Sequence, residues 1–348
     1  MTVMKFNADY YKKVIKEFGY TPFQLKRINF TLGSLSREEM RRLWLCHDKG
    51  DIFAQRFEKG ERSIVTTGVG LSGVPHVGTI SQIMRAVRLQ RAGVQVNFVL
   101  GDLDAYNGKN TSLLEARKLA RRYKRFALRL GLRNSKNSII RSQYDSRDVL
   151  LTSYIIGHYM DDSMFGRAEE DLHDFYKRRG KVEDMSYRRK LSLNLMIGDF
   201  VDLYLRKGFE NVLVSLGIDE HRYVLFALET IRRMNKDTPV GRSRMKLGAI
   251  YTPIIRGLYD YPKMSKSFPK SSITVDMSPA EIQERIINGE GKRSSPEENV
   301  VYQMMSAASN YKIEDLELNY RLCAKGGKQW SDAKKEYSEM LIKMCSKW

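Results

Sequence analysis

The stretch that decides the fold is Ser63-Ile-Val-Thr-Thr-Gly68-Val-Gly70-Leu-Ser-Gly73-Val-Pro75-His76-Val-Gly78-Thr79. Its β-branched start predicts a buried strand, and its glycines match the GxGxxG pattern of a strand-to-helix turn that approaches a phosphate. Apolar residues then recur at helical spacing as far as Arg91. His76 would stand at the N-terminus of that helix, where free N–H groups attract anions. The glycine run alone is weak evidence, because many tight turns need small residues.

The same alternation of strand and helix continues along the chain. A second buried strand is expected over Val94–Leu100, and it leads into Gly101-Asp102-Leu-Asp104. The next helix opens with a capping box, Ser112-Leu-Leu-Glu115. Strand character returns at Asn211–Leu216, directly before Gly217-Ile-Asp219-Glu220. This order predicts an α/β fold, in which helices cover the faces of a parallel sheet.

Three units are expected along the chain. Residues 1–60 read as a helical lead-in and 61–277 as the sheet domain, with helical and polar material inserted at about 144–207. Ser278-Pro279-Ala-Glu281 is a capping box with proline at the first helical position, and Ser295-Pro296-Glu-Glu298 predicts a second one. Residues 278–348 therefore predict an all-helical C-terminal domain.

Composition sets the broad class of protein. The 348 residues carry 60 Lys and Arg against 41 Asp and Glu, a net charge of +19 that suggests a nucleic-acid partner. No apolar run approaches the roughly 18 residues of a membrane span, and the first residues hold no apolar segment of a secretory signal. Cys46, Cys323 and Cys345 are too scattered for a disulfide framework or a metal clip. We therefore expect no membrane contact, no bound metal of its own and a cytoplasmic location.

A second chemical motif is Lys263-Met264-Ser265-Lys266-Ser267, in a loop bounded by prolines. The two lysines can supply positive charge to a triphosphate, and the small hydroxyl residues near them can donate hydrogen bonds to its remaining oxygens. A mobile basic loop also suits a step in which negative charge develops on departing pyrophosphate. A solvated surface loop is the plainer alternative, but the five-residue string is too specific for that to be our main interpretation.

These two motifs, Pro75-His76-Val-Gly78 and Lys263–Ser267, resemble the signatures of class I aminoacyl-tRNA synthetases. The resemblance is strongest to tryptophanyl enzymes of archaeal and eukaryotic type, with tyrosyl enzymes next, and it covers most of the chain. It implies a Rossmann-like catalytic domain that activates an amino acid, tryptophan first, with ATP. The aminoacyl adenylate would be transferred to tRNA, which the C-terminal helical domain, residues 278–348, would bind. Mg²⁺ accompanying ATP and a homodimer are implied as well.

The resemblance also implies roles for individual residues. His76, Lys263 and Lys266 would be catalytic. ATP would be bound by a larger set of small, polar and loop residues: Gly68, Gly70, Gly78, Thr79, Gly217, Asp219, Met264, Ser265 and Ser267. The amino acid would be bound by Thr66, Val99, Asp104 and Glu220, and the two acids would receive its ammonium group.

Three pocket positions depart from the tryptophanyl pattern. Thr66 stands where the family carries tyrosine, Val99 where a glutamine faces the indole nitrogen, and Glu220 where glutamine is usual. A pocket that leaves a buried indole N–H unpaired binds tryptophan poorly. The alternative is therefore a paralogue with altered specificity, serving a biosynthetic or regulatory role. Asp199 or Asp202 could supply a different partner.

Positive charge gathers in one expected helix and in two short clusters. The helix carries Arg117, Lys118, Arg121, Arg122, Lys124 and Arg125, and the clusters are Lys177-Arg178-Arg179 and Arg188-Arg189-Lys190. They predict salt-dependent contacts with tRNA phosphates, although a solvated face is the plainer alternative.

Two other classes of function remain open. A dehydrogenase would need an acid about twenty residues after the glycine run, and Asp102 comes later than that. An inactive RNA-binding relative would not need His76 or Lys266.

Overall fold

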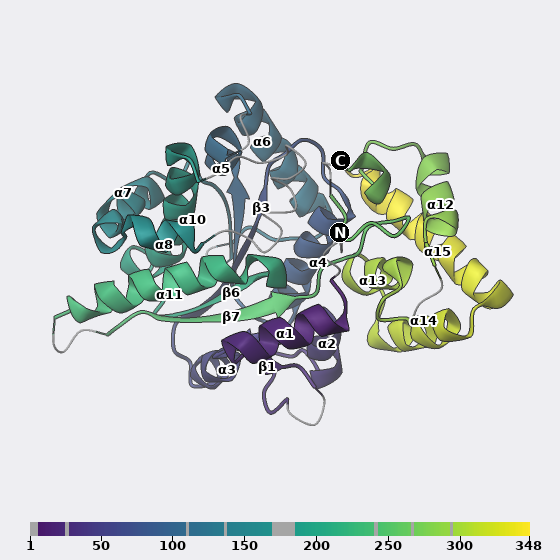
Figure 1. Ribbon diagram of the computed structural model, residues 1–348, viewed down its shortest axis with the longest axis horizontal. Helices are drawn as coiled ribbons and strands as arrows, with labels where there is room; N and C mark the ends of the chain where they lie inside the picture. The colour runs from purple at the N-terminus through teal and green to yellow at the C-terminus, as the bar shows by residue number, and fades with distance from the viewer. Residues whose placement is uncertain are drawn as a thin grey trace.

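The structure is a computed structural model, and it describes residues 6–24, 28–108, 111–135, 138–168, 185–239, 243–265, 268–292 and 295–348. Its centre is a seven-stranded sheet in the order β1-β2-β7-β6-β3-β4-β5 (Figure 1). The strands are β1 Thr21–Pro22, β2 Cys46–Asp48, β3 Ser63–Gly70, β4 Val96–Gly101, β5 Ile139–Ser142, β6 Asn211–Gly217 and β7 Lys246–Thr252. The strands from β7 to β5 run parallel, whereas β2 is antiparallel to β7 and β1 is antiparallel to β2.

The central strand of the parallel part is β3. From β3 the chain moves outward to β4 and β5, and then it returns to the other side of β3 to form β6. The carboxyl ends of β3 and β6 therefore flank the point where the strand order reverses, which is where open α/β sheets bind ligands. The predicted parallel α/β fold is confirmed. The strands β5 and β7 and the two short strands before residue 60 were not predicted.

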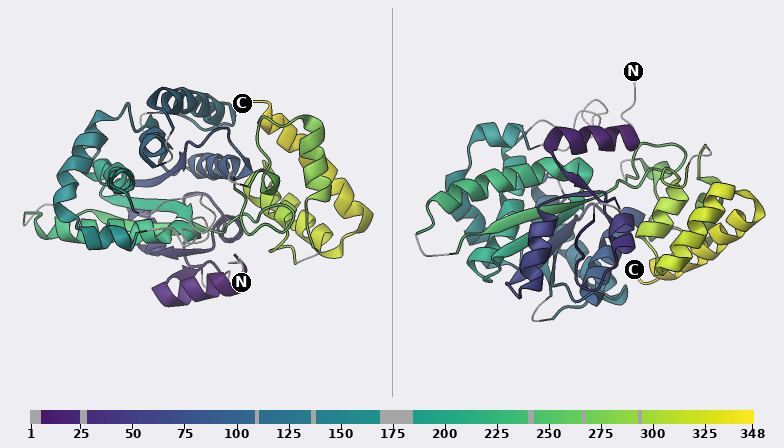
Figure 2. Two further views of the ribbon diagram at one scale, coloured as in Figure 1. Left: turned by 45° about the horizontal axis from the view of Figure 1, so that its top comes forward. Right: turned by 90° about the horizontal axis from the view of Figure 1, so that it is seen from below.

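Helices cover both faces of this sheet (Figures 1 and 2). In chain order they are α1 Ala8–Phe18, α2 Arg37–Leu43, α3 Gly50–Glu58, α4 Val77–Arg91, α5 Asp102–Gly108, α6 Leu113–Arg129, α7 Arg147–Ile156, η1 Gly157–Tyr159, α8 Asp162–Gly166, α10 Tyr187–Leu205, η2 Ile218–Glu220, α11 His221–Lys236, η3 Pro269–Ser271, α12 Pro279–Asn288, α13 Val300–Ala307, α14 Ile313–Lys325 and α15 Gly327–Cys345.

Neighbouring residues of β3 enter two different hydrophobic cores, because side chains alternate across a strand. Val65 packs with residues of α4 and α6 on one face. Ile64 packs with residues of α10 and α11 on the other. The sheet is therefore buried on both sides, as expected of a parallel sheet.

The C-terminal helices share a core with the sheet domain. Met304 of α13 and Tyr337 of α15 belong to the same apolar cluster as Val65 and the apolar face of α4. In Figure 1 these helices stand together at one end of the molecule, with α13 nearest α4.

The starts of two C-terminal helices test the capping predictions. Ser278 and Glu281 form the predicted capping box at α12. The expected helix start at Ser295 is wrong, because α13 begins at Val300. The Asn299 side chain accepts the N–H groups of Val301 and Tyr302 there, at 3.0 Å each.

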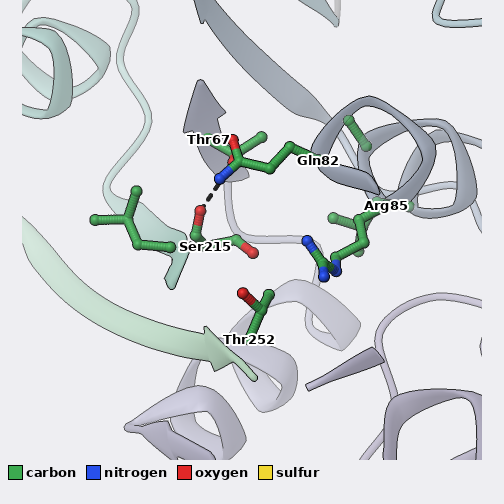
Figure 3. Close-up of a pocket in the computed structure, with 8 residues that line it drawn as sticks. Thr67, Gln82, Arg85, Ser215 and Thr252 are labelled. Atoms are coloured by element: carbon green, nitrogen blue, oxygen red, sulfur yellow. Dashed lines mark hydrogen bonds between the residues drawn. The ribbon is translucent and has the colours of Figure 1, made fainter. Parts of the chain in front are cut away.

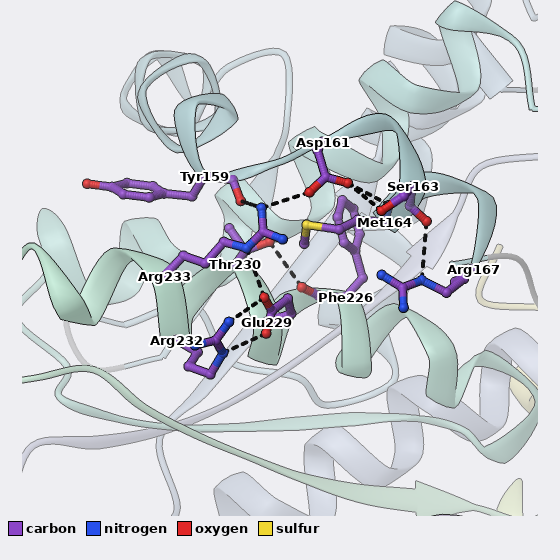
Figure 4. A network of polar contacts seen from close by, with 10 residues as sticks. All are labelled: Tyr159, Asp161, Ser163, Met164, Arg167, Phe226, Glu229, Thr230, Arg232 and Arg233. Carbon is purple, nitrogen blue, oxygen red and sulfur yellow. Dashed lines mark hydrogen bonds and ion pairs between the residues drawn. The ribbon is translucent and has the colours of Figure 1, made fainter.

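The helices between β5 and β6 are tied to α11 by a polar network (Figure 4). Arg233 lies 2.9 Å from Asp161, the N-cap residue of α8, and 2.8 Å from Glu229 on its own helix. Arg232 reaches the same Glu229 carboxylate at 2.7 Å. Within the described residues, no helix combines the length and apolarity needed to cross a membrane.

Candidate active site

His76 is the N-cap residue of α4, at the carboxyl end of β3. Its Nδ1 accepts the N–H of Gly78 at 2.9 Å, so the neutral ring carries its proton on Nε2. A Cβ atom at position 78 would lie 2.5 Å from Cε1 of this ring. Gly78 therefore allows the imidazole to lie against the helix N-terminus, where a phosphate would be attracted.

The predicted glycine turn is partly strand. β3 continues through Gly70, and a Cβ at Gly68 would lie 2.6 Å from the carbonyl oxygen of Val99. Gly68 thus permits the close approach of β3 and β4. Gly73 has a φ of 79°, and its carbonyl accepts the hydroxyl of Tyr123 on α6 at 2.9 Å. The side chain of Thr79 is buried and hydrogen bonds to the same Tyr123.

The first motif lies against the segment that follows the lysine loop. Val77 donates to the carbonyl of Ile273 at 3.0 Å, and Val275 donates to that of Pro75 at the same distance. His76 and Thr274 form an antiparallel bridge between them. The segment that follows the lysine loop therefore lies directly beside the start of α4.

The first part of the lysine loop is held by backbone contacts. Met264 is buried and donates to the carbonyl of Ile255 at 3.1 Å. The hydroxyl of Ser271 accepts the N–H of Ser265 at 3.0 Å and donates to its carbonyl at 3.1 Å. Lys266 and Ser267 lie outside the described residues, as do Lys177, Arg178 and Arg179.

Lys263 forms an ion pair with Asp219, which follows β6 in η2. Only 3% of the Asp219 side chain is exposed, against 27% for Lys263. A Cβ at Gly217 would lie 2.5 Å from Oδ1 of Asp219, so glycine at that position makes room for the carboxylate. Two residues predicted to bind ATP from different motifs are thus in direct contact.

Thr66 and Val99 lie on the adjacent parallel strands β3 and β4, where Thr66 pairs with Asn97 and Val99 pairs with Gly68. Thr66 is fully buried, and its hydroxyl accepts the side-chain N–H of Asn97 at 3.0 Å. Asp104 lies beyond the end of β4, 3.7 Å from Arg189 on α10. Its N–H donates to the side chain of Gln143 at 3.1 Å. Glu220 is half-buried at the start of α11.

A buried ionic cluster lies beside Val99, and the sequence did not predict it. Arg141 of β5 pairs directly with Val99 of β4 in the sheet. Its guanidinium lies 2.6 Å from Asp202 and 3.2 Å from Asp199, both on α10. Gln143 also donates to Asp199, at 2.9 Å. Burial raises the pKa of Asp199 to about 6, against the opposing charge of Arg141.

No group of three or more His, Cys, Asp or Glu side chains among the described residues is arranged to hold a metal ion. Mg²⁺ that enters with a nucleotide needs no such cage, because phosphate oxygens and water supply most of its ligands.

The segment after the lysine loop lies against the capped N-terminus of α4, near the point where the parallel sheet reverses its strand order, and such points are where open α/β sheets bind ligands. The family model for class I tRNA synthetases (W and Y) matches residues 58–343. The chain therefore belongs to the class I aminoacyl-tRNA synthetases of the tryptophan and tyrosine type, and the resemblance of its motifs is confirmed. Members of this family are aminoacyl-tRNA ligases that use ATP.

Curated relatives and solved structures point to different amino acids. The tyrosine–tRNA ligase of Methanosarcina barkeri is 26% identical over 249 residues, which is 70% of each chain. That of Archaeoglobus fulgidus is 27% identical over 237 residues, 67% of this chain and 66% of the relative. Tryptophanyl-tRNA synthetase from Aeropyrum pernix has a TM-score of 0.75 at 18% identity, covering 98% of this chain and 92% of that one. The Encephalitozoon cuniculi enzyme bound to tryptophan has a TM-score of 0.72 at 17% identity, covering 97% and 94%.

Proposed function

We propose that this chain activates one amino acid with ATP and transfers it to the 3′ end of tRNA. The observation that carries the proposal is the contact between the first motif and the segment after the lysine loop, in which residues 75–77 hydrogen bond to residues 273–275. This contact would place the N-terminus of α4 and the lysine loop around one triphosphate. Gly217 and Asp219 are the proposed ribose contacts, because Gly217 ends β6 and Asp219, two residues later in η2, pairs with Lys263.

In the proposed reaction, a carboxylate oxygen of the amino acid forms a bond to the α-phosphorus of ATP, and the bond to pyrophosphate breaks. The Nε2–H of His76 and the N–H groups at the start of α4 stabilise the negative charge on the phosphates. Lys263, with Lys266, neutralises the departing pyrophosphate. A ribose hydroxyl of tRNA then attacks the adenylate carbonyl, and AMP leaves. Mg²⁺ bound to ATP adds further charge neutralisation.

The amino acid is proposed to be tryptophan first, with altered specificity as the second candidate. The layer around Thr66 and Val99 bears on this choice. Thr66 is already paired with Asn97, and Val99 adjoins the cluster of Arg141, Asp199 and Asp202. A layer this polar suits a substrate side chain that forms hydrogen bonds, because a buried polar group without a partner is costly.

Amino-acid-dependent exchange of pyrophosphate into ATP, run with all twenty amino acids, tests both parts. We expect one amino acid to support exchange, and His76→Ala to abolish most of it. Exchange with tryptophan supports the first candidate, whereas exchange with another amino acid supports the second. If no amino acid supports exchange, the proposed function is wrong.

We also propose a homodimer formed through the helices that follow β5. Leu150, Leu151, Tyr154 and Ile155 of α7 are exposed, as are Tyr187 and Leu191 of neighbouring α10. Exposed apolar side chains gathered on adjoining helices are typical of a protein interface. Cys46, Cys323 and Cys345 are free thiols, in keeping with the cytoplasm as the proposed location.

A further inference from the structure

A small cavity lies between α4 and the carboxyl ends of β3, β6 and β7 (Figure 3). The space open to the centre of a water-sized sphere is about 10 Å³, which leaves room for one small occupant, such as a water molecule or a monatomic ion. Polar side chains from all four elements surround it: Thr67, Gln82, Arg85, Ser215 and Thr252. The cavity lies beneath the candidate ATP site, because Ser215 in its lining is two residues before Gly217 on β6.

Arg85 brings a positive charge to this cavity without a negative partner. The residue is 5% exposed, and its one hydrogen bond runs to the hydroxyl of Ser81 at a long 3.4 Å. Among the described residues no carboxylate pairs with it, and the charge acting on it is the like charge of Arg88. Burial lowers the pKa of the Arg85 guanidinium to about 9. Buried charges normally have a counter-charge, because an isolated one costs several kcal/mol.

The other polar lining groups include both donors and acceptors, and Ala86, Leu89 and Leu216 complete the lining. The Ser215 hydroxyl accepts the indole N–H of Trp44 at 3.1 Å. Its own proton can therefore be donated to an occupant of the cavity. The Thr67 hydroxyl donates to the carbonyl of Ser215 at 2.8 Å and holds β3 and β6 in place. The Arg85 Nε and the Gln82 Oε1 are buried atoms without a hydrogen-bond partner. A flip of the Gln82 amide would turn its NH₂ toward the cavity.

We propose that this cavity binds one monovalent anion of halide size, with the Arg85 guanidinium as its counter-charge and Ser215 and Thr252 as further donors. A carboxylate or phosphate is too large for the space. The bound ion would neutralise Arg85 and link α4 to the ends of β3, β6 and β7, which carry the candidate ATP-binding glycines. Binding of the ion does not depend on the proposed function, because it can be detected without turnover.

Anomalous diffraction from crystals grown in bromide locates the ion directly. We expect one peak within hydrogen-bond distance of the Arg85 guanidinium and of the Thr252 hydroxyl. A water molecule in the cavity, or a peak only elsewhere, overturns the proposal.

Thermal unfolding in chloride, compared with gluconate at equal ionic strength, measures whether the ion matters in solution. At tenfold the Kd, chloride should raise the Tm by about 2–4 °C. Arg85→Met should lose this response and still fold, because replacing an unpartnered buried charge with an apolar side chain is often neutral or stabilising. Thr252→Val, which keeps the charge, should weaken the chloride response severalfold.

Arg91→Met is the matched control, since Arg91 is exposed on the same helix. It should retain the full chloride response. If Arg85→Met responds like the wild-type protein, or if gluconate stabilises as well as chloride, the proposal is wrong. A bromide peak without any effect on the Tm would mean an adventitious ion only, and would equally overturn it.

Discussion

Lys263 and Asp219 neutralise each other at the point where the proposed nucleotide would bind. When ATP binds, its ribose would contact the Asp219 carboxylate and its phosphates would contact the Lys263 ammonium group. Asp219→Asn keeps the size of the side chain and removes its charge. We expect kcat/KM for ATP in pyrophosphate exchange to fall by about 10- to 100-fold, the value of one to two charged hydrogen bonds.

The control for this variant is Asp332→Asn, which removes an exposed carboxylate on α15. It should leave ATP kinetics unchanged. An Asp219→Asn enzyme with wild-type kcat/KM for ATP would contradict the role of Asp219 in binding the ribose.

Asp199 should make stability depend on pH. Burial raises its pKa from 3.8 to about 6, so between these values the folded protein holds a proton that the unfolded chain has released. This group therefore favours the folded state at low pH, and its contribution, roughly 3 kcal/mol, is lost as the pH rises through about 6. Asp199→Asn should remove that part of the pH dependence.

Denaturant unfolding from about pH 4 to pH 7 measures this effect. Asp148→Asn is the control, because it removes an exposed carboxylate on α7 and should leave the pH dependence as it is. If Asp199→Asn unfolds with the same pH profile as the wild-type protein, the raised pKa has no effect on stability.

At the scale of elements, α6 supports the glycine turn through Tyr123. Tyr123→Phe removes the hydroxyl that donates to Gly73 and leaves a carbonyl without its partner. We expect a loss of about 1–3 kcal/mol in unfolding free energy, together with a raised KM for ATP. Tyr154→Phe, which removes a hydroxyl from an 85% exposed side chain on α7, should leave the KM for ATP unchanged. An unchanged KM for ATP would show that the turn does not depend on this hydrogen bond.

The outer face of α6 is the proposed tRNA surface. Lys118, Arg121, Arg122, Lys124, Arg125 and Arg129 are exposed there. Arg122 also lies over the ring of Trp348, 4.3 Å from its centroid. Replacing Arg121 and Lys124 with alanine should weaken tRNA binding and lower the slope of log K against log salt by about one for each lost phosphate contact.

Adenylate formation should be unaffected by this double replacement, because α6 presents that face away from Gly73. The control is Lys59→Ala, which removes an exposed lysine at the C-terminal end of α3. An equal salt slope in the wild-type and the double-replacement protein would mean that this face does not contact tRNA.

Contiguous motifs allowed the central elements to be predicted. His76 and Lys263 were identified because each stands in a short, specific string, and β3 and α4 because their apolar spacing is regular. The role of Arg141 could not be predicted, because β5 has only four residues. Its place beside the pocket depends on the pairing of Arg141 with Val99, which no local pattern encodes. The support of Gly73 by Tyr123 also joins residues 50 apart in sequence, a contact that no local pattern encodes.

At the scale of the whole molecule, the exposed side chains of α7 test the proposed homodimer. Leu151 and Tyr154 are 50% and 85% exposed, whereas Val149 and Ile156 of the same helix are fully buried. Leu151→Glu should therefore disrupt the interface without disturbing the core. In sedimentation, the wild-type protein should have twice the mass of the chain and the variant the mass of one chain. Glu58→Lys, an exposed change on distant α3, should remain dimeric.

Pyrophosphate exchange by the same variant separates assembly from chemistry. The lysine loop and the N-terminus of α4 come from one chain, and residues 273–275 link them. A monomeric Leu151→Glu protein should therefore retain adenylate formation if its pocket does not depend on the partner subunit. Loss of exchange together with dimerisation would mean that the interface holds α10, and with it Asp199 and Asp202, in the active position. A wild-type protein that sediments as a single chain would contradict the homodimer.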